Sequence, residues 1–329
     1  MSICVCGGAG YIGSHAVRCL FDHGLDIIVI DNLSKGHRLA LDPRIPFYQG
    51  DLRDRVFLDK VFSENKIEGV IHFAADSLVG ESVLEPLKYY QNNVMGTLTL
   101  LEVMNQHKVK TIIFSSTAAT YGEPVSTPIL EEDPTIPTSP YGESKLAVEK
   151  LLKWCDHAYG IKYIALRYFN VAGAHPSGDI GEDHQPESHL IPLILNVALG
   201  KTPSIKIFGT DYPTKDGTCI RDYIHVMDLA EAHFLALNKV QETRQSKIYN
   251  LGNGQGYSVQ EVIQTARKVT GHPIPTLSIE RRPGDPAILL ASSQKACDEL
   301  GWKPQYFELS TIIESAWAFH QKHPNGFSD

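Results

Sequence analysis

The feature that most constrains this chain is a glycine-rich turn that lies between two apolar runs near its start. The first run, residues 3–6, has the length of a buried parallel strand, and the turn follows it directly at residues 7–13. Helical apolar spacing then covers residues 14–23, and a second apolar run at residues 27–30 ends on Asp31. This order of strand, glycine turn, helix, strand and acid predicts the first unit of a doubly wound α/β fold.

The same segment has the features of a dinucleotide site. Gly7 permits a tight turn, Gly10 lacks the Cβ that would keep a pyrophosphate from the backbone, and Gly13 lets helix and strand pack closely. The helix N-terminus offers free N–H groups to the phosphates. Asp31 stands 18 residues after Gly13, where its carboxylate can accept hydrogen bonds from both hydroxyls of the adenosine ribose and would repel a 2′-phosphate. We therefore predict NAD, and not NADP, as the cofactor.

Length, charge and cysteine usage exclude several classes of function. With 329 residues and an ordinary composition, the chain can form one large or two closely packed domains. Its formal charge of −8, without a block of Lys and Arg, argues against nucleic-acid binding. We expect neither export nor a membrane span, because no secretory leader precedes the turn and no apolar stretch nears about eighteen residues. The six cysteines show no C-x-x-C pair and no Cys/His metal spacing, so we expect a protein of the reducing cytoplasm with no metal site.

Apolar runs alternate with helical patterns through the first half of the chain, which predicts a doubly wound parallel sheet of the Rossmann type. After Asn170 the alternation breaks down, and residues 172–188 have the Gly, Pro, Asp, His and Ser content of a long functional loop. We therefore expect an NAD-binding domain over residues 1–169 and a smaller mixed α/β substrate domain over residues 170–329, with later segments able to pack back on the first sheet. The expected strands are residues 27–30, 46–48, 70–74, 112–115, 163–167, 205–208 and 248–251, and the expected helices are residues 54–65, 86–107, 141–159, 190–199, 226–237, 293–300 and 309–320, with one more capped by Ser258.

Three side chains around the fifth expected strand indicate redox chemistry. Tyr141 and Lys145 lie four residues apart and so share one helix face, and Thr117 follows the strand. A tyrosine has a reference pKa of about 10, which a neighbouring ammonium and a positive nicotinamide ring would lower. The Thr117 hydroxyl can share a proton with the same substrate oxygen. We therefore expect Tyr141 to act as the base in hydride transfer at an alcohol carbon.

The G-x-x-G-x-x-G spacing and the Thr–Tyr–Lys set resemble the extended branch of the short-chain dehydrogenase/reductase superfamily. Further strings make the chain similar to the UDP-glucose 4-epimerases over nearly its whole length, among them Ser-Pro-Tyr-Gly-Glu-Ser-Lys at 139–145 and Arg-Asp-Tyr-Ile-His-Val at 221–226. The resemblance implies interconversion of UDP-glucose and UDP-galactose, by transient oxidation at sugar C4 with bound NAD and non-stereospecific return of hydride. It also implies a homodimer that forms through the expected helices at 86–107 and 141–159. The other matching strings are residues 7–15, 72–75, 114–122, 167–170, 173–183, 207–220, 249–252 and 281–285.

The resemblance implies roles for individual residues. Asn170 would hydrogen-bond the sugar and Phe208 would lie by the uracil ring. Arg221 and Arg282 would pair with the diphosphate, and Asp285 would accept hydrogen bonds from the uridine ribose. The turn and the resemblance together place Gly7, Gly10, Tyr11, Ile12, Gly13, Asp31, Asn32, Asp51, Leu52, Phe73, Ala74, Ala75, Asn92, Ser115, Tyr141, Lys145 and Tyr168 at NAD, and add Thr117, Tyr141, His189, Leu190 and Leu289 to the UDP-hexose contacts.

Several positions depart from the family pattern and leave alternatives open. Thr117 stands where serine is more usual, and His189 stands where many relatives have asparagine. Leu289 is intermediate between the bulky and small residues of relatives, so UDP-N-acetylhexosamines or UDP-pentoses remain alternative substrates. A nucleotide-sugar dehydratase is less favoured, because Ala118 and Ala119 occupy the positions where dehydratases need an Asp-Glu pair. A non-catalytic NAD-sensing protein is also less favoured, because it would not need the Thr–Tyr–Lys set.

Overall fold

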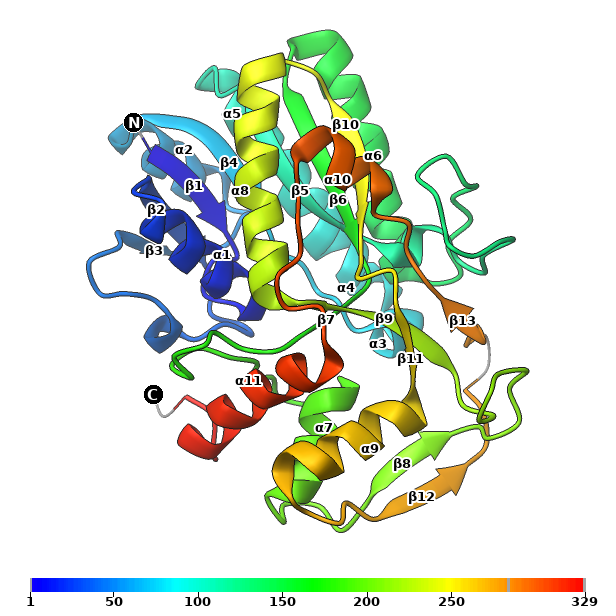
Figure 1. The fold of residues 1–329 in the computed structure, drawn as a ribbon. Coiled ribbons are helices and arrows are strands. Elements are labelled where there is room, and N and C mark those ends of the chain that lie inside the picture. The colour runs from blue at the N-terminus through cyan, green and yellow to red at the C-terminus, as the bar shows by residue number, and fades with distance from the viewer. Residues whose placement is uncertain (1, 283–284, 328–329) are drawn as a thin grey trace.

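Seven parallel strands form the central sheet of the computed structural model, which describes residues 2–282 and 285–327 (Figure 1). The strand order is β10-β6-β5-β4-β1-β2-β3, so the chain winds outward from β1 in both directions. This sheet confirms the predicted α/β fold with a doubly wound parallel sheet. Its strands are β1 (Ser2–Cys6), β2 (Asp26–Asp31), β3 (Phe47–Gln49), β4 (Ile67–His72), β5 (Thr111–Thr117), β6 (Lys162–Tyr168) and β10 (Lys247–Leu251).

Helices cover both faces of this sheet, and the alternation of side chains along β1 shows why. Ile3 and Val5 point into a core beneath α1, α8 and α10, whereas Cys4 and Cys6 point into a core beneath α2, α5 and α6. The cysteines therefore serve as small apolar residues of the second core. The helices are α1 (Tyr11–Asp22), α2 (Arg55–Glu64), α3 (Val79–Leu84), α4 (Pro86–Tyr89), α5 (Gly96–Gln106), α6 (Pro140–Tyr159), α8 (Val226–Thr243) and α10 (Gln294–Leu300), with a π-helical turn η2 (Tyr90–Met95) and short 3₁₀ turns η1 (Arg38–Ala40) and η3 (Ala118–Thr120).

A second group of elements packs below the carboxyl edge of the large sheet (Figure 1). Its core lies between α7, α9 and α11, which pack with the two-stranded sheet of β8 and β12. A small sheet of β7, β9, β11 and β13 joins the two groups, because β9 leads directly into α8. The bounds are β7 (Asn170–Ala172), α7 (Leu190–Ala198), β8 (Ile205–Phe208), β9 (Ile220–His225), β11 (Gly256–Ser258), α9 (Val259–Thr270), β12 (Thr276–Ile279), β13 (Ile288–Leu289) and α11 (Leu309–Lys322).

The structure differs from the sequence prediction in local details. The first helix begins at Tyr11 and not at residue 14, and the expected helix at 86–107 contains a π-helical turn. The short strands of the small sheet were missed, since pairing between distant segments leaves little periodicity in two to six residues. Three elements that follow residue 170, β10, α8 and α10, belong to the large sheet and its cover. The boundary at residue 170 stays a prediction.

Among the described residues, no helix has the length and apolar character needed to cross a membrane.

The contact between α1 and the glycine turn predicts which glycine supports the fold. A Cβ at position 13 would lie 2.1 Å from the Gly7 carbonyl oxygen, a distance that no atom pair can keep, whereas the nearest contact of a Cβ at position 10 would be an ordinary 3.5 Å. We expect Gly13→Ala to lower the free energy of unfolding by about 1–3 kcal/mol, because the helix must move off the turn. Gly10→Ala is the matched control and should change it little. Urea unfolding measures both, and equal losses in the two variants would contradict this packing.

Candidate active site

The three predicted catalytic side chains meet at the carboxyl ends of β5 and β6. Thr117 is the last residue of β5, and it pairs in register with Tyr168 at the end of β6. Helix α6 begins beside them, where Ser139 caps it by accepting a hydrogen bond from the Gly142 N–H at 3.2 Å. The cap places Tyr141 in the first turn of the helix, near enough to Thr117 for the Thr117 hydroxyl to lower the pKa of the phenol. The structure therefore brings together the residues that the sequence predicted as one group.

Burial controls the charge state of this group. It raises the pKa of Tyr141, and the Thr117 hydroxyl is the neighbour that lowers it. Burial also lowers the pKa of Lys145 to about 7, although the charge of Glu149 opposes that shift. The Lys145 ammonium donates to the Ser115 carbonyl oxygen at 2.8 Å. The structure therefore does not show the expected lowering of the Tyr141 pKa by Lys145, because burial favours the neutral form of the lysine itself.

Buried polar residues that sequence reasoning missed support this group. Glu149, one turn beyond Lys145 on α6, pairs with Arg167 at 2.6 Å and accepts from the Ser116 hydroxyl at 2.5 Å. Its spacing of four from Lys145 was a signal that could have found it. The predicted cofactor residue Ser115 is fully buried, with its hydroxyl 3.0 Å from Nε2 of His233 on α8. His233 lies 118 residues further along the chain, and no local pattern indicates it.

The glycine turn, β2 and β4 come together as the cofactor prediction requires. Gly7 has φ +77°, and a Cβ there would lie 2.5 Å from the Ala74 amide nitrogen, so only glycine lets the residues after β4 approach. The Asp31 carboxylate ends β2 and accepts from the Ala9 N–H at 2.9 Å and the Leu33 N–H at 2.8 Å. These bonds lower the pKa of Asp31 against the larger effect of its burial, which raises it. The open side of Gly10 and the first turn of α1 form a cradle that fits a pyrophosphate.

The other predicted cofactor residues lie around this edge. Asp51 follows β3 and pairs with Arg53 at 2.6 Å, which lowers its pKa to about 2. Asn32 donates to the same carboxylate at 3.4 Å. Asn92 lies in η2, but its neighbour Asn93 is the buried residue there, with its amide hydrogen-bonded to the Asp76 backbone and the Ser144 hydroxyl. Tyr11 begins α1, and its hydroxyl donates a hydrogen bond to the Gly173 carbonyl oxygen at 2.6 Å. Ile12 and Phe73 pack on the first core, and Leu52 and Ala74 belong to or adjoin the second. Ala75 and Tyr168 are partly buried at the same edge.

Four of the predicted substrate residues contact one another in two pairs. Arg221 forms an ion pair with Asp285, and the Arg282 guanidinium lies 3.8 Å from the centre of the Phe208 ring. Leu289 on β13 pairs with Arg221 on β9. A ligand would have to replace the Arg282 contact to stack on Phe208. Asn170 is exposed at the start of β7, and Leu190 is the first residue of α7.

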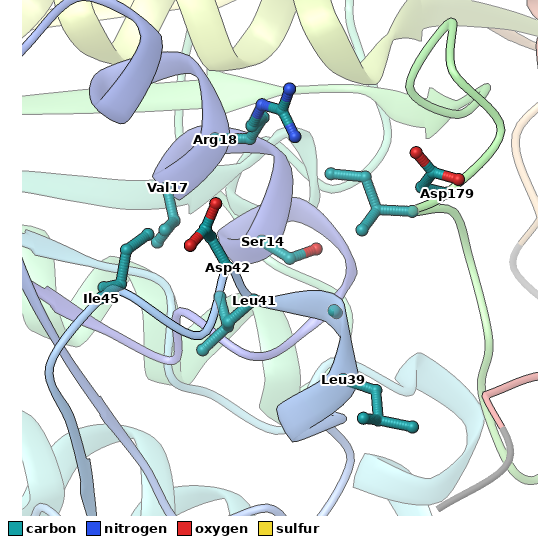
Figure 2. A pocket seen from close by; sticks show the side chains of 10 residues that line it. Ser14, Val17, Arg18, Leu39, Leu41, Asp42, Ile45 and Asp179 are labelled. Carbon is teal, nitrogen blue, oxygen red and sulfur yellow. The ribbon is translucent and has the colours of Figure 1, made fainter.

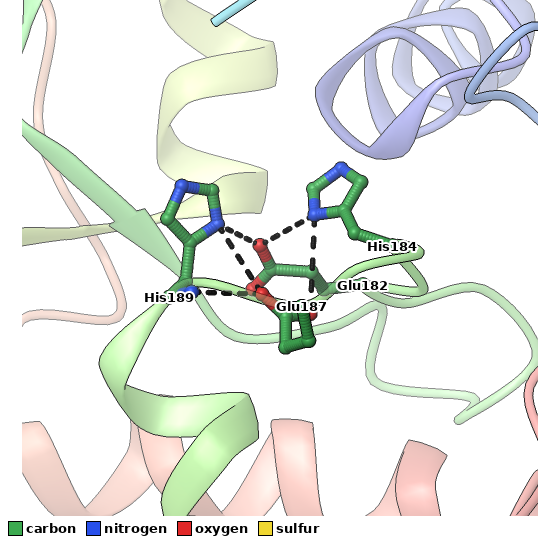
Figure 3. A group of neighbouring side chains, drawn as sticks. All are labelled: Glu182, His184, Glu187 and His189. Carbon is green, nitrogen blue, oxygen red and sulfur yellow. Dashed lines mark hydrogen bonds and ion pairs between the residues drawn. The ribbon is translucent and has the colours of Figure 1, made fainter. Parts of the chain in front are cut away.

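His189 precedes α7 and belongs to a polar cluster that sequence reasoning missed (Figure 3). Its Nδ1 hydrogen-bonds Glu182, whose charge raises the pKa of His189 to about 9. His184 and Glu187 complete the cluster.

A separate pocket between α1, η1 and Asp179 has no predicted site residue among its described lining residues (Figure 2).

Comparisons with known proteins agree with this geometry. Residues 3–252 match the model of the NAD dependent epimerase/dehydratase family. The UDP-glucose 4-epimerase of Halalkalibacterium halodurans is 61% identical over all of this chain and 98% of its own length. The crystal structure of UDP-glucose 4-epimerase from Bifidobacterium longum in complex with NAD⁺ and UDP has a TM-score of 0.95 and 44% identity, over 99% of this chain and 100% of that one. The UDP-Glc/GlcNAc 4-epimerase of Campylobacter jejuni has a TM-score of 0.86 and 41% identity, over 98% and 99%.

The burial of Lys145 predicts a specific dependence of stability on pH. Because its pKa falls from 10.5 to about 7 on folding, unfolding takes up a proton between these values and the parent becomes more stable as pH rises through this range. Lys145→Met removes the titration. The unfolding free energy of the variant minus that of the parent should therefore grow as pH falls from 10 to 7 and level off below 7.

Urea unfolding between pH 6 and 10 measures this difference. Lys153→Met, at an exposed position of the same helix, is the matched control, and its difference from the parent should not follow that curve. A difference that is flat with pH for Lys145→Met would show that the lysine keeps its charge in the folded protein.

Proposed function

The chain belongs to the NAD dependent epimerase/dehydratase family, and we propose that Tyr141, Lys145 and Thr117 carry out its reaction at C4 of a UDP-hexose. That reaction is the interconversion of UDP-glucose and UDP-galactose, the activity for which its full-length relatives are named. NAD is the cofactor. The observation that supports the three residue roles is the meeting of one buried phenol, one buried amine and one hydroxyl at the carboxyl edge of the sheet.

The roles of the protein side chains follow from their positions. The glycine turn and Asp31 would hold NAD, which would supply reversible hydride acceptance, oxidised NAD⁺ for the removal of hydride from C4 and the reduced form for its return to either face of the sugar. Tyr141 removes the proton of the sugar 4-hydroxyl, and the Thr117 hydroxyl, which lies near the phenol, holds the same oxygen. Since the pKa of Lys145 is about 7, part of it is charged at neutral pH and can favour the phenolate.

The nucleotide is held apart from the reacting carbon. We assign Arg221 and Arg282 to the diphosphate, Phe208 to the uracil and Asp285 to the uridine ribose, which requires the existing contacts among these four to open. Several charged and aromatic side chains are assigned to the nucleotide and few to the hexose. This suits a sugar that must rotate to present its other face between the two hydride transfers. In this assignment residues 1–169 bind NAD and residues 170–329 bind the nucleotide sugar.

Dehydration is a poor fit to the same edge. Ala118 and Ala119 lie in the 3₁₀ turn directly after Thr117, and neither side chain can move a proton at C5.

All six cysteines lie within the described residues, and none forms a disulfide, in keeping with a protein of the reducing cytoplasm.

The activity is tested by incubating the pure protein with UDP-galactose and measuring UDP-glucose by chromatography. Tyr141→Phe should lower turnover by about two to four orders of magnitude, because proton transfer at the 4-hydroxyl is lost, and should still release NAD on denaturation. Tyr163→Phe, a buried tyrosine of β6 outside the group, is the matched control and should keep turnover within a few-fold.

Two results would contradict the roles assigned here. Normal turnover by Tyr141→Phe would remove the proposed base. A build-up of reduced cofactor equal to the sugar consumed would mean net dehydrogenation and not epimerisation.

A homodimer is the assembly that the surface supports. Leu84, Leu87 and Trp154 are 81%, 75% and 68% exposed on α3, α4 and α6, and these helices pack side by side. Large exposed apolar side chains on adjoining helices are typical of a contact with another protein. The helices include those that the resemblance implies for the dimer.

Leu87→Glu should convert the dimer to a monomer, because it would bury a carboxylate at this contact. Light scattering after size-exclusion chromatography measures the mass. Val56→Glu, which is 80% exposed on α2 and so outside these three helices, is the matched control and should stay dimeric. A Leu87→Glu dimer of unchanged stability would place the contact elsewhere.

A further inference from the structure

Two histidines and two glutamates form a cluster within eight residues of the loop before α7 (Figure 3). Glu182, His184, Glu187 and His189 each offer one ligand atom, and these atoms all lie within 4.8 Å of one another. The spacing E-x-H-x-x-E-x-H contains no cysteine, so a search for Cys/His patterns does not find it. We propose that this cluster binds one divalent metal ion of the zinc class, at a site that serves the structure of the loop and not the chemistry at C4.

The distances between the ligand atoms fit a small tetrahedral ion. A zinc ion with bonds of about 2.0–2.2 Å to nitrogen and oxygen separates its ligand atoms by roughly 3.3–3.5 Å. Nδ1 of His184 lies 3.2 Å from Glu182 Oε1 and 3.9 Å from Glu187 Oε2, and Nδ1 of His189 lies 3.9 Å from Glu187 Oε1. The fourth pair, His189 with Glu182, is a direct hydrogen bond that must lengthen. The coordination shell would form when the Glu187 carboxylate also turns, so that one of its oxygens faces both imidazoles, and all four ligand atoms already lie within 4.8 Å of one another.

The ligands are already oriented toward one point. Both imidazoles present the same nitrogen, Nδ1, to the carboxylates (Figure 3). The Glu187 carboxylate is held in place because its Oε1 accepts from the N–H groups of Ser188 and His189 at 2.7 and 2.8 Å. Such bonds to a ligating carboxylate are the usual outer support of a metal site.

Charge and donor type select the ion. The carboxylates of Glu182 and Glu187 are only 4% and 12% exposed, and the charge of His189, whose pKa Glu182 raises to about 9, offsets one of the two negative charges. A divalent cation would displace that proton to solvent and would neutralise both carboxylates. Imidazole donors favour zinc over magnesium and calcium, which prefer oxygen alone. Four protein ligands leave no open position, as in structural zinc sites.

The location explains what the ion would do. The rings of His184 and Tyr11 are 6.2 Å apart in an edge contact, and Lys35 donates to the Gln185 carbonyl at 2.7 Å. The loop therefore touches the start of α1 and the segment after β2 on one side, while His189 leads into α7 on the other. An ion here would fasten the substrate half of the molecule to the cofactor turn.

Zinc binding tests the proposal. The intact NAD-containing enzyme is freed of metal with a chelator, desalted and titrated with ZnCl₂ against a chromophoric competitor. We expect one zinc per chain with sub-micromolar affinity and a rise in the thermal midpoint. The double variant His184→Gln/Glu187→Gln should bind at least 100-fold more weakly and lose that rise. The matched control is His23→Gln, at a second cluster of Cys19, His23 and Glu231, and it should bind as the parent does.

X-ray absorption at the zinc edge of the parent identifies the ligands without any variant, so misfolding of the double variant leaves the test intact. Two imidazole nitrogens and two carboxylate oxygens are expected. A sulfur ligand would assign the ion to Cys19 and overturn the proposal. Equal binding by the double variant, displacement by equimolar magnesium, or absence of stoichiometric binding would also overturn it. Epimerase failure alone would leave these readouts unchanged.

Discussion

The close approach of α1 to the end of β1 is the contact on which the rest of the site depends. A Cβ at Gly13 would overlap the Gly7 carbonyl oxygen, and one at Gly7 would overlap the Ala74 backbone. Because both positions are glycine and carry no Cβ, the ends of β1 and β4 and the first turn of α1 meet at van der Waals distance. The Asp31 carboxylate then reaches the Ala9 N–H and joins β2 to the same turn. The cofactor half of the edge is therefore made by backbone packing, with few side chains involved.

Removal of water is the second physical effect at this edge. Burial raises the pKa of the Tyr141 phenol and lowers that of the Lys145 amine, so it favours the neutral form of both. A phenolate then forms only when positive charge is brought beside it. This links the proposed base to bound NAD⁺, whose nicotinamide ring is cationic in the oxidised state. A base that gains strength only with the oxidised cofactor in place suits a reaction that begins and ends with NAD⁺.

The substrate half relies on charged side chains held by one another. The Arg221–Asp285 ion pair and the Arg282 contact on Phe208 satisfy groups that we assign to the nucleotide. In the loop before α7, Glu182 and His189 satisfy each other in the same way. Side chains that pair with one another in the free protein and with a ligand in the complex keep these charges paired in both cases. The protein therefore avoids the free-energy cost of an unpaired buried charge.

The sequence by itself determined the class of fold, the cofactor and the reaction family. These depend on local patterns, namely the glycine spacing with Asp31, the four-residue interval between Tyr141 and Lys145, and the alternation of apolar runs. Only the tertiary structure decided what surrounds them. His233 beneath Ser115, Glu149 with Arg167, and the polar loop around His189 are contacts between distant segments or loop conformations, and neither produces a periodic signal. The charge state of Lys145 was likewise beyond the sequence, because it depends on the burial of the side chain, which only packing in three dimensions can bring about.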